Sequence, residues 1–350
     1  MLARIAQELF WLGRDLTRAE HTARMLDGAF HADVAGGVGG ANSRGIAISW
    51  HGVLAVIGSK PPVPGQDGRE SGELTPGASV PTLRELSRLE IAPLLTLDTD
   101  NPASVVSCVY RARERARTLR DVISTEMWEA LNSFYLRLGR YDLEAALATG
   151  PYSVYQEVKE RCALFWGLLE KTMLRDEARS FLDAGGRIEE ADMVLRMLRV
   201  AMPMTDFEQL DGVDEVTGGA THNAAHEAEA LALLQAVGGF QAFRRSVHVA
   251  PDVDHVGRFL LYESAYPGSV ASALAELREA LNTADQSPRT SPPVLRLGRL
   301  IADLELQQRA TQTAGSLTAL LASVQDELGL IDRDIDERYF AVAGLMAVHV

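Results

Sequence analysis

The chain repeats part of its own sequence, and this repeat restricts its fold more than any other feature. The motif Pro-x-Ser-Val at 102–105 returns at 267–270, and Arg113-Glu114 returns as Arg278-Glu279 at the same offset. A period of roughly 165 residues is that of a duplicated structural unit, not of a short solenoid repeat.

The N-terminal segment repeats as well. Residues 13–26 return at 185–198 with matching glycine, alanine, acidic and Arg-Met-Leu positions, and in this register Arg14 aligns with Gly186. We therefore expect two pseudo-repeated helical halves, 1–150 and 151–350, that together form one compact unit.

Apolar periodicity gives the fold class. Apolar residues recur every three or four positions over 2–27 and again after Pro102, which is typical of amphipathic helices. Alternating β-branched runs are absent. The sequence therefore predicts an all-α helical bundle, with one long flexible loop rich in proline and glycine at 59–82.

Composition excludes several classes of function. The 34 basic and 48 acidic residues give a net charge of −14, which argues against nucleic acid or an anionic membrane as partner. The two cysteines cannot form a disulfide framework, and neither a signal peptide nor a membrane span is evident. We therefore expect a cytoplasmic protein. No cofactor-binding motif is present, so no cofactor is expected.

An arginine row follows Pro102. On a helix, Arg113, Arg117 and Arg120 fall within an arc of about 60°, beside the apolar stripe, so we expect them to be half-buried. They could form a pocket for a carboxylate, a phosphate or an acidic peptide. Alternatively, they make structural ion pairs with acidic residues of the first helix, such as Glu20.

Further charged and aromatic residues are candidates for the same site. On the first helix Glu20 and Arg24 form an i,i+4 pair, and Arg14 and Arg18 are like charges one turn apart. Each of these candidates also has a structural interpretation, as ion pairs, caps or core. The remaining candidates for a substrate-binding or anion-binding site are Glu114, Glu126, Trp128, Asn132, Arg175, Asp176 and Glu177. If the protein is an enzyme, Glu20 or Glu114 is the candidate acid or base.

A weak metal-binding candidate lies in the second half. His222, His226 and Glu229 have i, i+4 and i+7 spacing, which places them on one helix face. An exposed polar face is the better interpretation, because the sequence shows no further ligand.

Long blocks of the chain resemble the bacterial alpha-E domain family. The resemblance lies in the runs 8–24 and 101–132 and in later blocks at 172–177 and 259–270. It implies an all-helical protein associated with a circularly permuted ATP-grasp ligase and a transglutaminase-like protein. The implied role is as an accessory subunit in making or processing amide-linked peptides. A peptide-processing enzyme and a purely structural scaffold are the alternatives.

Four positions depart from the family pattern. Thr17 stands for a usual Glu, His21 for a usual Asn, and Gly186 and Glu190 for usual arginines. If the family's charged residues form a site, the second half of this chain has lost much of its share.

Overall fold

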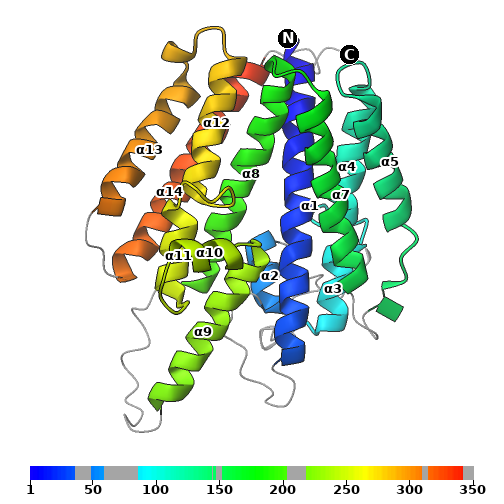
Figure 1. Cartoon of the computed structure of the whole chain (residues 1–350). Helices are drawn as coiled ribbons and strands as arrows, with labels where there is room; N and C mark the ends of the chain where they lie inside the picture. Colours follow the sequence, from blue (N-terminus) through cyan, green and yellow to red (C-terminus); the bar gives the residue numbers. More distant parts are fainter. Residues whose placement is uncertain are drawn as a thin grey trace, which may run out of the picture.

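The fold is built from helices alone. The computed structural model describes residues 1–35, 49–58, 86–143, 145–146, 152–202, 218–309 and 314–341, with main chain only at 32–35, 152, 218–226 and 314–316. In these residues the chain forms 13 α-helices and no strand, which confirms the predicted all-α class (Figure 1). The predicted loop at 59–82 lies outside this range. None of the described helices combines the length and apolarity needed to cross a bilayer.

Two long helices form the centre of the bundle. α1 (Ala3–Ala35) and α8 (Glu177–Ala201) have the most extensive contact of any helix pair among the described residues. Glycines let their backbones touch. A Cβ on Gly13 would lie 2.2 Å from the carbonyl oxygen of Leu182, and one on Gly185 would lie 1.8 Å from that of Phe10. Any side chain at these positions would separate the helices.

Each central helix has its own set of neighbours. Helices α4, α5 and α7 lie on the α1 side of the bundle, and helices α12, α13 and α14 lie on the α8 side (Figure 1). Their bounds are α4 (Val105–Thr118), α5 (Thr125–Leu138), α7 (Tyr152–Thr172), α12 (Val270–Ala284), α13 (Pro292–Arg309) and α14 (Ala314–Ile335). A π-helical turn, η3 (Asp336–Phe340), extends α14 and packs against α1.

Further helices lie at one end of the bundle. They are α2 (Trp50–Ile57), α3 (Arg88–Thr96), α9 (Gly218–Ala236), α10 (Phe240–Ser246) and α11 (Val253–Tyr262). The 3-10 turn η2 (Pro288–Thr290) joins α12 to α13. The sequence did not predict α3, α10 or α11. They have 9, 7 and 10 residues, too few for a clear helical period.

Two serines begin helices in the same way. Ser104 and Ser269 are fully buried N-caps of α4 and α12. Each hydroxyl donates to the carbonyl six residues earlier, at 2.6 and 2.7 Å, and accepts the N–H three residues later, at 3.2 and 3.1 Å. Capping of this kind satisfies main-chain donors that the helix leaves free.

Two glycines end helices in the same way. Gly58 follows α2 with a φ of 74°, and Gly238 follows α9 with a φ of 70°. Both have the left-handed conformation that favours glycine. A Cβ on Gly58 would lie 3.8 Å from Nη1 of Arg196 in α8, and one on Gly238 would lie 3.2 Å from Nη1 of Arg24 in α1.

Candidate functional site

A cavity of about 790 Å³ lies between α1, α7, α8 and α12, within the size range of small-molecule sites. Its lining is strongly charged, with apolar walls at Trp166, Leu169 and Val237. Six carboxylates line it, from Glu20, Glu170, Asp183, Glu190, Glu276 and Glu279, against four guanidinium groups, from Arg24, Arg175, Arg179 and Arg187. The cavity therefore has an excess of negative charge.

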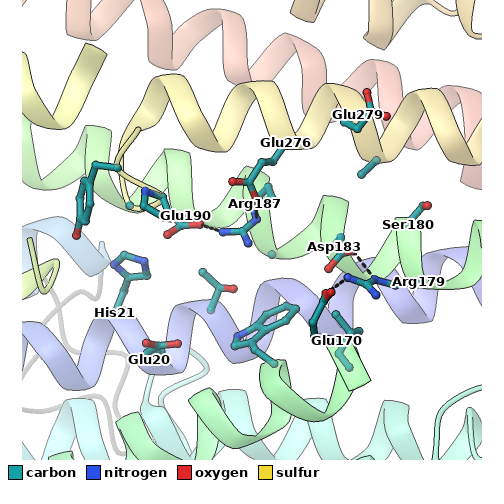
Figure 2. Close-up of a pocket in the computed structure, with 18 of the residues that line it drawn as sticks. Glu20, His21, Glu170, Arg179, Ser180, Asp183, Arg187, Glu190, Glu276 and Glu279 are labelled. Carbon is teal, nitrogen blue, oxygen red and sulfur yellow. Dashed lines mark hydrogen bonds and ion pairs between the residues drawn. The ribbon is translucent and has the colours of Figure 1, made fainter. Parts of the chain in front are cut away.

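One end of the cavity is organised around Arg179 (Figure 2). Its guanidinium donates to Glu170 and, through Nε, to Asp183 at 3.2 Å. Nη1 is buried without a hydrogen-bond partner. Hydrogen bonds from Arg179 and Arg175 lower the pKa of Glu170, whereas burial raises the pKa of Asp183. This end therefore has an unused N–H donor.

Arg187 occupies the middle of the cavity, between two helices (Figure 2). It donates to Glu190 one turn along α8, and its Nε lies 2.8 Å from Oε2 of Glu276 on α12. Burial would lower the pKa of Arg187, but the two carboxylates hold it above its ordinary value. Arg187 therefore stays charged and links α8 to α12.

The other end contains a histidine without partners. His21 is 7% exposed, its Nδ1 is buried, and neither ring nitrogen has a hydrogen-bond partner among the described residues. Burial lowers the pKa of His21, although the nearby carboxylates of Glu190 and Glu20 act in the opposite direction. The ring is therefore neutral near pH 7, with one nitrogen able to accept a hydrogen bond.

A glycine makes room for the cavity wall. A Cβ on Gly186 would lie 2.7 Å from Cη2 of Trp166 and 3.4 Å from Oγ1 of Thr17. The indole of Trp166 therefore occupies the space that a side chain at position 186 would need. We call this side of the α1–α8 contact the cavity flank.

The opposite side is filled by ion pairs, and we call it the closed flank. Arg14 and Arg18 of α1 share the fully buried carboxylate of Glu189 in α8, and Arg14 also donates to Asp332 of α14 at 2.8 Å. Burial alone would raise the pKa of Glu189, but the two guanidinium groups hold it below its ordinary value. The predicted like-charge pair thus has a carboxylate between its members.

A second buried carboxylate belongs to the closed flank. Asp15 accepts from Arg111 at 2.7 Å and from Arg115 at 2.8 Å, so it joins α1 to α4. The acidic residues of α1 that pair with arginines of α4 are thus Asp15 and Glu8. Oε2 of Glu8 lies 3.4 Å from Nε of Arg115. Glu20 is not among them.

The arginine row does not meet Glu20. Arg113 is half-buried and donates to Glu114 at 2.6 Å and to Asn132 of α5 at 2.8 Å. Arg117 also pairs with Glu114, at 2.8 Å. Arg117 and Arg120 are exposed, contrary to the expected half-burial. The row faces α5 instead of α1. The prediction that the row and Glu20 line a single pocket is therefore wrong.

The other candidates have separate places. Trp128 lies under the guanidinium groups of Arg113 and Arg120, beside a smaller hollow of about 310 Å³. Glu126 is exposed in the first turn of α5. Asp176 is the N-cap of α8, and Glu177 pairs with the N-terminal amine at 2.9 Å. These last two act at a helix end, outside the cavity lining.

The metal candidate is only partly described. Glu229 is buried on α9, whereas the side chains of His222 and His226 lie outside the described range. Among described side chains, no group of three or more His, Cys, Asp or Glu is arranged to hold a metal ion.

Sequence reasoning found part of the cavity. Of the candidates it named, Glu20, Arg24 and Arg175 line the cavity. It did not name the remaining lining residues as part of a site. The four positions that the resemblance singled out as departures, Thr17, His21, Gly186 and Glu190, all line the cavity. Those departures were the available signal.

Comparison with protein-family models gives one match. Residues 1–340 match Alpha-E, described as a predicted alpha-helical domain with a conserved ER motif. No curated protein and no solved structure matches the chain. Because the match covers nearly the whole sequence, this chain belongs to the Alpha-E family.

Proposed function

We propose that this chain is a helical accessory subunit that binds a peptide-like substrate for an amide-ligation or peptide-processing system. The observation that carries the binding role is the cavity of about 790 Å³ with two buried, unpartnered polar groups, Nδ1 of His21 and Nη1 of Arg179. Leaving such groups without hydrogen bonds is costly, so a ligand that pairs with them is favoured. The partners, an ATP-grasp ligase and a transglutaminase-like protein, are proposed from the family resemblance.

The charges of the cavity favour a ligand with both signs. Arg179 offers a donor to a carboxylate or carbonyl at one end, while carboxylates surround His21 at the other (Figure 2). A purely acidic peptide would meet six carboxylates. We therefore place the binding site in this cavity and not on the row of Arg113, Arg117 and Arg120, whose members pair within α4 and α5 or stack on Trp128.

We also propose that the two halves are copies of one unit. Matching serine caps, Ser104 and Ser269, support this, as do matching glycine ends, Gly58 and Gly238. The approach of Gly58 to Arg196 and of Gly238 to Arg24 implies that each unit contributes a helix end to the central helix of the other. Because α7 packs on α1 and α5, it fits the first unit better than the second.

A pull-down from the host tests the accessory role. Tagged full-length protein is compared with Arg179→Gln, and Arg113→Gln serves as a matched control outside the cavity. Capture of an ATP-grasp ligase or a transglutaminase-like protein by wild type and control supports the proposal. Capture of neither class by folded wild-type protein contradicts it.

A further inference from the structure

We infer that the end of the cavity formed by Glu20, His21 and Glu190 binds a primary ammonium group. The inference rests on the cavity being the ligand site proposed above, and it specifies which chemical group of the ligand this end recognises. It does not depend on the identity of the partner proteins.

Unused acceptors are the first reason. Arg24 makes both of its hydrogen bonds to Oε1 of Glu20, and Arg187 donates to Oε2 of Glu190. The other oxygen of each carboxylate accepts no hydrogen bond from the described residues. His21 adds a ring nitrogen without a partner, and its ring lies between the two carboxylates (Figure 2). Three acceptors match the three N–H donors of an ammonium group.

A missing positive charge is the second reason. In the repeat register, Arg14 aligns with Gly186 and Arg18 with Glu190. On the closed flank those two arginines neutralise Glu189. On the cavity flank the position aligned with Glu189 is Thr17, the two aligned arginine positions supply no guanidinium, and one of them adds the carboxylate of Glu190. The cavity lining as a whole has six carboxylates against four guanidinium groups, and a ligand cation would reduce this excess of negative charge.

The lining favours an ammonium group over a metal ion. No described set of three His, Cys, Asp or Glu side chains is arranged to hold a metal ion. An ammonium group donates hydrogen bonds, which are longer than metal–ligand bonds and can reach acceptors that stand apart. Trp166 offers an apolar wall for the carbon chain attached to the ammonium group.

The test uses three probes of equal chain length: n-butylammonium, 1-butanol and butyrate. The full chain is labelled with 5-fluorotryptophan, and binding is followed by fluorine NMR at Trp166. Trp11, Trp50 and Trp128 lie outside the cavity lining and report non-specific effects. We expect saturable binding of n-butylammonium with a Kd of up to about 10 mM, and at least roughly tenfold weaker binding of the other two. No saturable shift, or equal binding of the alcohol or the carboxylate, would overturn the inference.

Variants place the effect at this end. Glu190→Gln and His21→Phe should each weaken n-butylammonium binding by roughly tenfold or more. Glu279→Gln, the same change as Glu190→Gln at the Arg179 end, should leave the Kd within about threefold. Equal loss in Glu279→Gln would mean attraction by bulk charge and would overturn the site. Thermal melts confirm folding, and Glu20→Gln replaces any variant that does not fold.

The ammonium site and the proposed function fail separately. If the protein binds n-butylammonium but captures neither partner class, the ammonium site is supported and the accessory role is rejected. If it captures the partners but does not select ammonium, the accessory role is supported and the ammonium site is rejected.

Discussion

On the closed flank of the α1–α8 contact, Arg14 and Arg18 enclose the carboxylate of Glu189, whereas on the cavity flank the aligned Gly186 and Glu190 border open space. The same pair of helices, touching through the same glycines, thus makes a filled interface on one side and a cavity on the other. The backbone permits both outcomes, and a few side chains decide between them.

One ion pair on the closed flank has a counterpart at the aligned positions of the cavity flank, with its charges exchanged. Asp15 pairs with Arg111 at 2.7 Å on the closed flank, and the aligned Arg187 pairs with the aligned Glu276 at 2.8 Å on the cavity flank. On each flank an ion pair therefore links the central helix to its neighbour, α1 to α4 and α8 to α12. The central helix supplies the carboxylate in the first pair and the guanidinium in the second. The flanks differ at three further aligned pairs: Gly186 and Glu190 stand where α1 has Arg14 and Arg18, and Thr17 stands where α8 has Glu189. Without the two guanidinium groups, the cavity flank keeps acceptors free for a ligand.

The largest expected effect concerns the contact that both flanks share. Gly185→Ala puts a methyl group onto the carbonyl oxygen of Phe10, a backbone atom that cannot rotate away. We expect the free energy of unfolding to fall by more than about 3 kcal/mol. Denaturant unfolding measures this, and a loss below about 1 kcal/mol would show that α1 and α8 do not pack so closely.

The exchanged ion pair should respond unequally. Asp15→Asn leaves the guanidinium groups of Arg111 and Arg115 without their shared buried carboxylate, and we expect a loss of about 2–3 kcal/mol. Arg187→Met should cost only about 1 kcal/mol, because its two partners, Glu190 and Glu276, line the cavity and can be solvated there. Equal costs in urea titrations would contradict the distinction between the flanks.

A smaller effect is expected at the cavity wall. Gly186→Ala meets the tip of the Trp166 indole instead of backbone, so the ring can tilt into the cavity. We expect a loss of about 1 kcal/mol together with a changed fluorine signal for Trp166. An unchanged signal would mean that Trp166 does not lie against position 186.

The smallest effect is a dependence on pH. His21 faces Glu20 and Arg24 on its own helix and Glu189 and Glu190 on α8, and burial lowers its pKa below the ordinary value of 6.5. The unfolded chain then binds the proton more readily, so stability is present above pH 6.5 and is lost as the pH falls below it. His21→Asn should reduce this slope between pH 7 and about 5. An identical slope in the variant would refute the assignment.

The sequence predicted α1 and α4 from several turns of apolar spacing, and α8 from its repeat of the first helix. Short helices such as α3 depend on tertiary packing and gave no such signal. Helical spacing placed Arg113 and Arg117 near one face, but it could not say whether α1 or α5 covers that face. Sequence reasoning named Glu20, Arg24 and Arg175 of the cavity but not the cavity as a whole, because its lining comes from helices such as α1, α7 and α12, and only the fold defines how these helices meet.

The most direct test of the difference between the flanks compares Glu189→Gln with Glu190→Gln, two identical changes at adjacent residues of α8. Each variant is measured for its free energy of unfolding and for its affinity for n-butylammonium. We predict that Glu189→Gln loses about 3 kcal/mol of stability and, where folded, keeps its affinity. Glu190→Gln should lose about 1 kcal/mol or less and bind roughly tenfold more weakly. Equal stability losses with unchanged affinity in both would show that the cavity flank is as structural as the closed one.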